Sequence, residues 1–398
     1  MGNTGTAIVA GGSIGGLFTA AALLKAGWTV RVFERVGVEL AGRGAGIVTH
    51  APLIDAFNAV GATTDNLGVP VEERVAFDIT GEVVRRVKHP QVVTSWDRIH
   101  QILRALMPEG AYRLGRTVTG YAEYDDGVEA IFDDGSREGA DLLVGADGFR
   151  SAIRGQMLPE VQPKYAGYVV WRAVTGEADL SEEVHERLFA DFSFFLPNRT
   201  QIIGYPIAGV GNDLRPGHRR YNFVWYSAVT DADLRDMLTD ADGGHHPISI
   251  PPPLVREDVL ARMEEDAERR LPPPFVEIIR QSERPFFTPI YDHCSPVFAK
   301  GRIALSGDAA CVARPHVGMG VTKAAEDALS LARHVSTAPL TEALQAYSDE
   351  RVPKSRRAYG QAQRLGAYIF DTDPKLNSDG RNNPKIDIIM RDTAVPVA

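Results

Sequence analysis

Cysteine is scarce in this 398-residue chain, which contains only Cys294 and Cys311. The two thiols do not form a C-x-x-C pair, and they supply too few ligands for a structural zinc site. His245 and His246 are adjacent in the sequence, but no second cluster of ligands accompanies them, so we predict a surface loop there and no metal site. Secreted chains of this length often carry more cysteines, so a cytoplasmic location is expected.

An excess of basic residues and long apolar runs are also missing. The formal net charge is −9, which argues against the basic face that binding to a nucleic-acid backbone requires. No apolar segment approaches the roughly 20 residues that cross a bilayer, and the first residues lack the basic region and cleavage site of a secretory signal. The content of 44% hydrophobic and 24% charged residues is typical of a globular protein. We therefore expect neither nucleic acid nor a membrane as a partner.

The first 35 residues contain a glycine turn between two short apolar strands. We expect a strand at Thr6–Ala10, a turn at 11–16, a helix at Leu17–Ala26 and a second strand that closes at Glu34. This βαβ pattern, with an acid about 20 residues beyond the glycines, predicts a dinucleotide site, because glycines let the backbone approach a pyrophosphate and Glu34 can accept hydrogen bonds from a ribose. Ser13 replaces the middle glycine of the usual fingerprint, and the motif alone does not separate NAD from FAD. The residues assigned to this site are Gly11, Gly12, Ser13, Ile14, Gly16, Glu34 and Arg35.

Two further strand ends carry an acid next to a glycine. The stretch "LLVGADGFRSAIR" ends a buried strand at Asp147-Gly148, and Ser151 and Arg154 follow. The stretch "RIALSGDAACVARPHVGMGV" ends another strand at Asp308 and continues through a glycine turn into a helix near Val321. Open α/β sheets place ligands at the carboxyl ends of their strands, and a helix N-terminus stabilises negative charge. Both stretches therefore predict parts of a ligand site.

Taken together and in this order, the three motifs resemble those of the single-component FAD-dependent aromatic hydroxylases, the flavoprotein monooxygenases similar to para-hydroxybenzoate hydroxylase. The resemblance covers nearly the whole chain and implies that FAD and NAD(P)H are the cofactors. It implies that the first motif binds the ADP part of FAD, that the second serves both FAD and NAD(P)H, and that the third holds the ribityl chain and the flavin. Within the family, "YAGYVVWRAV" and "RPHVGMGVTKAAEDA" are most similar to the 2,6-dihydroxypyridine 3-monooxygenase branch. Beyond the first motif, the residues that the resemblance assigns to the cofactors are Arg98, Val118, Asp147, Gly148, Arg154, Gly307, Asp308, Pro315, Gly318, Gly320, Val321 and Thr322.

Three positions depart from the family's pattern. Cys311 stands where relatives often have histidine, and Thr322 stands where they often have asparagine. Neither replacement removes a backbone contact, so FAD binding is expected to persist. The arginine that many relatives place just before a helix aligns here with Trp96, and Arg98 is the neighbouring arginine expected to reach the flavin.

The resemblance implies an α/β fold with an α+β substrate part, in which a Rossmann-like FAD-binding domain carries an inserted antiparallel-sheet substrate domain. Aromatic and β-branched residues in "YVVWRAV", "QIIGYPI" and "RRYNFVWYSAV" predict strands of that sheet. Alternation along the third strand puts Asn222, Val224 and Tyr226 on one face. The resemblance favours this face as the pocket wall, and a slip of one residue would swap the faces. The expected boundaries are 1–165 for the first part of the FAD-binding domain, 166–284 for the substrate domain, and 285–398 for the second part of the FAD-binding domain with C-terminal helices.

The implied reaction is the addition of oxygen from O2 to a small electron-rich aromatic ring, a hydroxypyridine or a similar phenol, through a flavin C4a-hydroperoxide. A base that deprotonates the ring hydroxyl would make the ring a better nucleophile, and positioned proton transfer is typically worth about 10²–10⁴-fold. The candidates for this base are His50, Tyr205 and His316, although His316 could instead cap the next helix and Tyr205 could fill the sheet. The expected substrate contacts are Asn222, Tyr226 and Pro315.

Two alternative functions are compatible with the motifs. One is a flavin reductase or halogenase on the same fold, although "VVWRAVTG" lacks the WxWxIP motif of such halogenases. The other is a flavin-binding protein without turnover, against which the intact Asp147, Arg154 and Asp308 argue. The sequence leaves NADH and NADPH as alternatives, and it leaves the oligomeric state open with a homodimer favoured.

Overall fold

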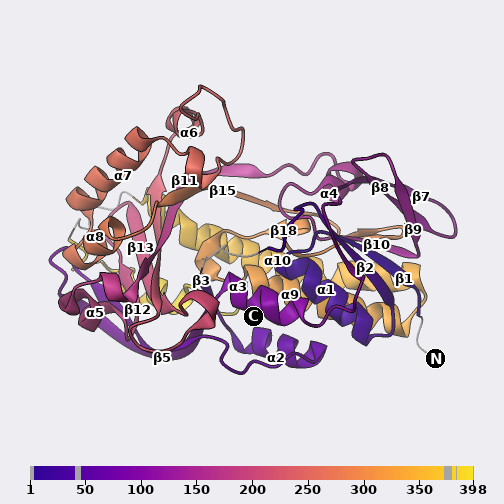
Figure 1. Cartoon of the computed structure of the whole chain (residues 1–398), viewed down its shortest axis with the longest axis horizontal. Coiled ribbons are helices and arrows are strands. Elements are labelled where there is room, and N and C mark those ends of the chain that lie inside the picture. Colours follow the sequence, from indigo (N-terminus) through magenta and orange to yellow (C-terminus); the bar gives the residue numbers. More distant parts are fainter. Residues whose placement is uncertain (1–3, 41–45, 372–378, 382, 398) are drawn as a thin grey trace.

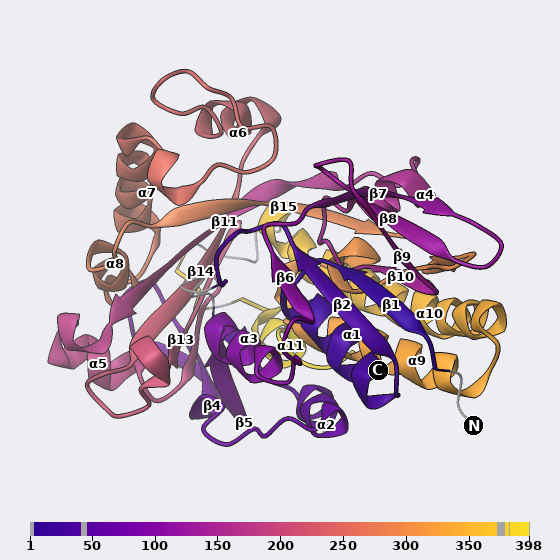
Figure 2. The ribbon, with the colours of Figure 1, turned by 45° about the vertical axis from the view of Figure 1, so that its right-hand side comes forward.

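The computed structural model describes residues 4–40, 46–371, 379–381 and 383–397. A six-stranded and a nine-stranded sheet lie side by side along the long axis of the molecule, and each has helices packed against it (Figure 1). A separate three-stranded sheet lies beside the six-stranded one (Figure 2). The mixed α/β class that the sequence predicts is confirmed.

The six-stranded sheet contains the predicted βαβ unit, which forms β1, α1 and β2. Its strands run in the order β16-β17-β10-β1-β2-β6, and all neighbours are parallel except β16 and β17. Helices α9 and α10 lie on the same side of this sheet as α1 (Figure 2). The bounds are β1 Thr6–Ala10, α1 Ile14–Lys25, β2 Thr29–Glu34, β6 Tyr112–Leu114, β10 Leu142–Gly145, β16 Ala299–Lys300, β17 Ile303–Leu305, α9 Gly320–Thr337 and α10 Leu340–Gly366.

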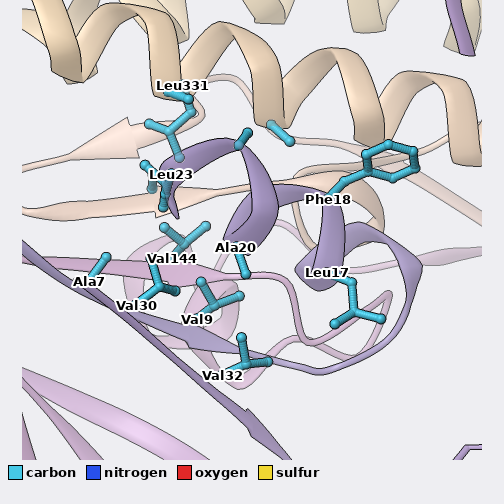
Figure 3. Packing of buried hydrophobic residues seen from close by; sticks show 14 of the residues in the cluster. Ala7, Val9, Leu17, Phe18, Ala20, Leu23, Val30, Val32, Val144 and Leu331 are labelled. Carbon is cyan, nitrogen blue, oxygen red and sulfur yellow. The ribbon is translucent and has the colours of Figure 1, made fainter. Parts of the chain in front are cut away.

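Helix α1 packs closely on this sheet because its residues are apolar and many are small. Figure 3 shows Leu17, Ala20 and Leu23 directed toward the strands, with Leu331 of α9 on the other side of Leu23. All four side chains are fully buried. Full burial of a leucine contributes about 1.5–3 kcal/mol, so this contact fixes the position of the glycine turn from which α1 begins.

Alternating apolar residues around two D-D-G sequences, at 125–127 and 133–135, predict a β-meander with turns at those sequences, and the three-stranded sheet is this meander. Strands β7, β8 and β9 pair in chain order and antiparallel. The first D-D-G sequence connects β7 to β8 and the second connects β8 to β9, as expected of turns. The bounds are β7 Val118–Glu123, β8 Val128–Phe132 and β9 Arg137–Ala140.

The nine-stranded sheet is largely antiparallel and runs in the order β18-β15-β11-β14-β13-β12-β4-β5-β3. It takes β3, β4 and β5 from residues 46–95 and β15 and β18 from beyond residue 284, so it is not confined to the predicted range 166–284. A division of the chain into domains at 165 and 284 therefore remains a prediction. The bounds are β3 Gly46–Val48, β4 Val69–Phe77, β5 Val83–Ser95, β11 Lys164–Gly176, β12 Phe192–Phe195, β13 Thr200–Ile207, β14 Arg220–Ala228, β15 Phe286–Cys294 and β18 Cys311–Val312.

The two faces of the nine-stranded sheet have different neighbours. One face packs on helices α5, α7 and α8 through an apolar cluster that includes Phe223 and Trp225. The other face carries Val224 and Tyr226 and packs against the C-terminal helix α11. None of the helices among the described residues is long and apolar enough to cross a membrane. The remaining helices are α2 Ala51–Val60, α3 Trp96–Arg104, α4 Ala152–Met157, α5 Glu182–Leu188, α6 Asp231–Met237, α7 Glu257–Arg270, α8 Pro273–Arg280 and α11 Ile386–Asp392.

Candidate active site

The glycine turn between β1 and α1 leaves no room for a side chain at Gly11 or Gly16. Gly11 has a φ of +104°, and a Cβ there would collide with the carbonyl oxygen of Ala146. A Cβ at Gly16 would collide with the carbonyl oxygen of Gly11. Ser13 is the N-cap of α1, but its side chain makes no capping hydrogen bond. The turn therefore presents backbone at the N-terminus of a helix, an arrangement suited to a pyrophosphate.

Glu34 closes this turn from the end of β2. Its Oε2 accepts a hydrogen bond from the backbone N–H of Gly12 at 2.9 Å, and its Oε1 accepts one from Val36 at 3.0 Å. The buried carboxylate still has lone pairs available, because an ionised carboxylate can accept about four hydrogen bonds. Arg35 beside it is exposed.

The second motif ties the end of β10 to the third motif. Oδ2 of Asp147 accepts a hydrogen bond from the N–H of Ala152 at 2.7 Å, at the start of α4. The side chain of Arg154 is buried and donates to the carbonyl oxygens of Phe149 at 2.6 Å and Ala309 at 3.1 Å. These hydrogen bonds from Arg154 to protein groups fix the backbone that follows Asp308.

Two buried atoms of this motif, Oδ1 of Asp147 and Nε of Arg154, have no hydrogen-bond partner among the described residues. Oδ1 of Asp147 is buried and makes no hydrogen bond within the described residues, and burial raises the pKa of Asp147. A buried oxygen without a partner costs free energy. A hydroxyl or N–H of a bound cofactor would supply that partner.

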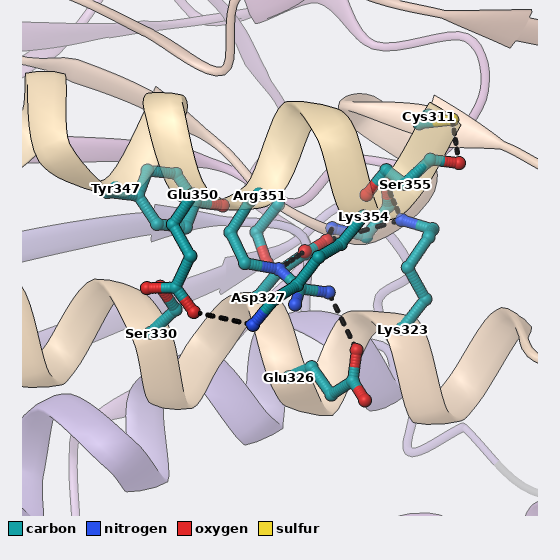
Figure 4. A network of polar contacts seen from close by, with 12 residues as sticks. Cys311, Lys323, Glu326, Asp327, Ser330, Tyr347, Glu350, Arg351, Lys354 and Ser355 are labelled. Carbon is teal, nitrogen blue, oxygen red and sulfur yellow. Dashed lines mark hydrogen bonds and ion pairs between the residues drawn. The ribbon is translucent and has the colours of Figure 1, made fainter. Parts of the chain in front are cut away.

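A buried ionic network holds Gly307 in a left-handed conformation with a φ of +61°. Lys323 donates from Nζ to the carbonyl oxygen of Gly307 at 2.8 Å, and Oδ2 of Asp327 accepts from the Gly307 N–H at 3.1 Å. Arg351 of α10 donates from Nε to Oδ1 of Asp327 at 2.7 Å (Figure 4). Both peptide groups of Gly307 are thus fixed by α9, and the next residue, Asp308, faces solvent in a cavity with no hydrogen-bond partner among the described residues.

The loop between β18 and α9 forms one side of this cavity. Pro315, Gly318, Gly320 and Val321 line it, and Gly318 has a φ of +62°. Helix α9 begins at Gly320 with no side-chain cap, so the positive end of the helix lies at the cavity. This loop can accept the flat edge of a ring system against its backbone.

The cavity has a volume of about 620 Å³ and separates the α9 loop from the nine-stranded sheet. The sheet side is aromatic and apolar, as in sites that bind small rings. Tyr205 and Tyr226 have phenol oxygens without hydrogen-bond partners among the described residues, and both are largely buried. The residues that line the cavity include Gly46, Ile47, Val48, Arg172, Phe192, Ile203, Tyr205, Val224, Tyr226, Asp308, Pro315, His316, Gly318, Gly320, Val321, Thr393 and Ala394.

Two of the predicted base candidates are uncharged imidazoles that bond to protein groups. Nε2 of His50 lies 3.1 Å from the carbonyl oxygen of Ala394, to which it must donate, and Nδ1 lies 2.9 Å from Oγ1 of Thr322. Burial lowers the pKa of His50 to about 4. Nε2 of His316 lies 2.9 Å from the Tyr168 hydroxyl, and burial lowers the pKa of His316 to about 3. His316 borders the cavity, whereas His50 lies behind its wall.

Tyr205, the third candidate, is held by its neighbours in the sheet. Its ring stacks on Phe192 with 4.8 Å between centroids, and burial raises the pKa of Tyr205. Its cross-strand partner is Asn222, whose Oδ1 accepts a hydrogen bond from the Gly46 N–H at 3.1 Å. Asn222 itself does not line the cavity but fixes the strand β3 that does. At neutral pH Tyr205 is a phenol that can donate a hydrogen bond.

Arg172 is a residue of the site that the sequence reasoning did not assign. It lies in the middle of β11, in register with Val224 of β14, and it borders the cavity. Its guanidinium has no hydrogen bond or ion pair within the described residues, and its positive charge lowers the pKa values of Tyr205 and Tyr226 against the larger effect of burial. A lone arginine in an apolar strand is the sequence signal that could have identified it.

Two further predicted residues, Val118 and Arg98, lie outside the three motifs. Val118 is buried in β7, opposite Phe132. Arg98 lies in the first turn of α3 and donates from Nη2 to the carbonyl oxygen of Asp65 at 2.7 Å. Among the described residues, no group of three or more side chains could hold a metal ion. The glycine turn, the unpartnered Asp147 oxygen and the free Asp308 carboxylate together fit a dinucleotide with a flat ring system.

Comparison with known proteins gives matches over nearly the whole chain. A family described as FAD binding domain-like matches residues 165–292. The chain is 31% identical over 364 residues to a 2,6-dihydroxypyridine 3-monooxygenase from Paenarthrobacter nicotinovorans, covering 91% of this chain and 90% of the relative. It is 32% identical over 378 residues to an aurachin C monooxygenase/isomerase from Stigmatella aurantiaca, covering 91% and 88%. The solved structure of 2,6-dihydroxypyridine-3-hydroxylase from Arthrobacter nicotinovorans has a TM-score of 0.88 and 30% identity, covering 97% of this chain and 99% of that one.

Proposed function

Since the chain belongs to the FAD-dependent aromatic hydroxylases and is a flavoprotein monooxygenase, we propose that it uses NAD(P)H and O2 to hydroxylate a hydroxypyridine. The observation that carries this proposal is the cavity between the α9 loop and the nine-stranded sheet. One side offers Asp308 and glycine backbone to a cofactor, and the other offers phenols and one guanidinium to a small polar ring. Similarity to 2,6-dihydroxypyridine 3-monooxygenase supports the choice of ring.

FAD would be held at several points of the six-stranded sheet. The 11–16 turn and Glu34 are proposed to bind the ADP part, and Asp308 the ribityl hydroxyls. Bound here, FAD would accept a hydride from NAD(P)H, and the reduced flavin would then activate O2. The protein's part is to position the rings, exclude water and provide fixed charges.

The substrate is proposed to bind as an anion between Arg172 and the two tyrosines. The Arg172 guanidinium makes no ion pair within the described residues, so it can hold a deprotonated ring oxygen with charge-assisted hydrogen bonds. Burial raises the pKa of Tyr226 to about 12 and also raises the pKa of Tyr205, so both phenols keep their protons at neutral pH and donate. An anionic ring is more electron-rich than a neutral one, which is what attack on an electrophilic oxygen requires.

The two histidines take supporting roles in this proposal. His50 bonds to Thr322 and Ala394, so it positions the start of α9 rather than acting as a free base. His316 stacks on Tyr226 with 4.2 Å between ring centroids and is held by Tyr168 on its other side. A neutral imidazole at this place keeps Tyr226 in the cavity wall without adding a second positive charge near Arg172.

The test is the oxidation of NADH and of NADPH by the FAD-loaded protein, measured without and then with O2 against a panel of hydroxypyridines and phenols. We expect 2,6-dihydroxypyridine or a near relative to accelerate flavin reduction and to yield a hydroxylated product. Reduction followed only by release of hydrogen peroxide would refute the ring assignment. If no compound accelerated reduction by either nucleotide, the monooxygenase proposal itself would fail.

A further inference from the structure

The C-terminal segment 383–397, which we call the strap, contacts both the nine-stranded sheet and the loop that precedes α9. It contains α11, of which Ile389 and Met390 are buried against the cavity side of the nine-stranded sheet. At its start, Nδ2 of Asn383 donates to the carbonyl oxygen of Leu196 at 3.0 Å, next to β12. Toward its end, the N–H of Ala394 donates to the carbonyl oxygen of His316 at 2.9 Å, in the loop that precedes α9.

A fully buried arginine of β4 holds the end of α11. Arg74 donates from Nη1 to the carbonyl oxygens of Met390 and Thr393, the latter at 2.7 Å, and from Nη2 to that of Ala394 at 3.2 Å. These are carbonyls that the end of a helix leaves without partners, and the negative end of the helix dipole attracts a cation there. The other hydrogen bonds of this guanidinium within the described residues go to Gln91, at 2.8 and 3.3 Å.

The partners of Arg74 are neutral oxygens, although an unpaired charge is costly to bury. A fold that needed only a packed sheet could place an apolar residue at this position. The arrangement therefore has a specific effect, which is to hold residues 390–394 at one place relative to β4. The Arg74 guanidinium also lies 5.4 Å from the centroid of the Phe192 ring, which lines the cavity.

The held residues form part of the cavity wall. Thr393 and Ala394 line the cavity beside Gly318. Ala394 has a φ of +52°, and a Cβ at Gly318 would lie only 2.9 Å from its Cα, so strap and α9 loop fit closely here. Nε2 of His50 donates to the Ala394 carbonyl oxygen, which fixes that residue from a third side.

We propose that the strap, held by Arg74, is a specificity-determining wall of the substrate cavity and that Ala394 limits the size of the ring that can bind. This inference rests on the proposed function, since it assigns the same cavity to the substrate. It makes Arg74 a positioning residue, because Arg74 acts through residues 390–394 and does not reach the ring itself.

The first experiment changes one side chain of the cavity wall and measures how strongly the cavity discriminates between ligands of one and two rings. FAD-loaded wild type and Ala394→Leu are titrated with 2,6-dihydroxypyridine and with a two-ring hydroxyquinoline, following the flavin absorbance. We expect Ala394→Leu to weaken hydroxyquinoline binding about tenfold or more relative to the single ring, because pocket contacts discriminate by such factors per added group. Ala394→Gly, which suits the positive φ, should relax the discrimination. Equal changes for both ligands in Ala394→Leu would overturn the proposal.

The second experiment releases the strap and compares two arginines that bond to the same helix. Arg85 makes an exposed ion pair with Asp387 of α11 at 2.6 Å, with side chains 50% and 55% exposed. We expect Arg74→Met to increase amide exchange at residues 389–394 and to increase quenching of flavin fluorescence by acrylamide, whereas Arg85→Met changes neither. Arg74→Lys should restore part of the protection. Unchanged exchange and quenching in Arg74→Met would contradict the assigned role.

The quenching measurement needs no substrate, so it distinguishes a failure of the strap proposal from a failure of the proposed function. If no aromatic ring binds to the wild type, the proposed function fails, and the strap is then judged by quenching alone. If Arg74→Met does not fold, Ala394→Leu decides the matter, since its change is confined to one side chain of the wall.

Discussion

Arg172 introduces a positive charge into a strand whose central residues are otherwise apolar, and it forms no ion pair with an acid in the part of the chain that the structure describes. We expect Arg172→Met to raise the Kd for a hydroxypyridine about 10- to 100-fold, because a hydrogen bond to a charged group contributes about 1.5–3 kcal/mol. The measurement is a titration of the FAD-loaded variant by flavin absorbance. Arg172→Lys keeps the charge but not the planar fork, and it should lie between wild type and Arg172→Met.

This expectation includes a control on the cofactor. Affinity for FAD should be the same in Arg172→Met and wild type, since Arg172 belongs to the sheet side of the cavity. A variant that bound hydroxypyridine as tightly as wild type would show that the ring does not bind as an anion at this arginine.

Two adjacent glycines at the start of α1 give a matched pair of substitutions. A Cβ at Gly16 would collide with the Gly11 carbonyl oxygen, whereas a Cβ at Gly15 would lie 3.5 Å from Cβ of Ala324, an ordinary contact. We expect Gly16→Ala to lose measurable FAD binding and Gly15→Ala to keep it, with alanine favoured over glycine in a helix. Isothermal titration of the apoproteins with FAD measures both. Similar affinities in the two variants would mean that the turn is not the pyrophosphate site.

Helices α9 and α10 supply the ionic network of Lys323, Asp327 and Arg351 (Figure 4), which holds Gly307 next to the proposed FAD contact Asp308. We expect Asp327→Asn to lower the free energy of unfolding by about 3–5 kcal/mol, because it leaves Lys323 and Arg351 buried without a full counter-charge. Affinity for FAD should also fall, because Gly307 loses its fixed orientation before Asp308. Urea unfolding and FAD titration measure the two effects.

A neighbouring acid of α9 serves as the comparison. Glu326 also pairs with Arg351, at 2.8 Å, but its side chain is 33% exposed. Glu326→Gln leaves Arg351 paired with Asp327 and removes a carboxylate that solvent reaches, so it should lower stability by clearly less than Asp327→Asn does and leave FAD binding unaltered. If both variants behaved alike, the network would be a general source of stability rather than support for Gly307.

At the scale of the whole molecule, histidines whose pKa values are lowered by burial make stability depend on pH. Burial lowers the pKa values of His50 and His293 to about 4 and that of His316 to about 3, from an ordinary value of 6.5. At pH values between about 4 and 6.5, these histidines bind more protons in the unfolded chain than in the folded one. The free energy of unfolding therefore falls as the pH decreases from 6.5 toward 4. His50 alone should account for about 2 kcal/mol of loss by pH 5.

The check is urea unfolding at pH 7.5 and pH 5, with saturating FAD, of wild type and His50→Gln. The variant should lose about 2 kcal/mol less than wild type over this interval, whatever its stability at pH 7.5. Equal losses in the two proteins would show that His50 titrates normally when folded.

Local patterns were predictable from the sequence wherever the chain's own periodicity determines the structure. The βαβ unit, the meander and the strands β11, β13 and β14 form close to where they are expected. The nine-stranded sheet was predicted incompletely, because β3, β4 and β5 join it only through β4, which pairs with β12 more than 100 residues further along the chain, and alternation carries no information on such a partner.

The site was predictable only where a motif marks it. Glycine turns and strand-end acids mark the side proposed to bind the cofactor, since their spacing is local. Arg172, Arg74 and Ala394 were missed because their proposed roles depend on burial and on neighbours that are distant in the sequence. An arginine in a strand, or an alanine in a polar tail, reveals neither its burial nor those neighbours. The ring nitrogens of His50 illustrate the same limit, because one of their partners, Ala394, lies 344 residues away.

The order of strands in the six-stranded sheet has a consequence for synthesis on the ribosome. Its centre, β10 beside β1, pairs only after residue 145 has emerged, and β17 joins only after residue 305. Strand pairing across such separations makes contact order high and folding slow. Until then the apolar face of α1 has no complete sheet to cover it, so the nascent chain exposes the very surface that later positions the glycine turn. We infer that chaperone demand during synthesis is greatest before β17 is made.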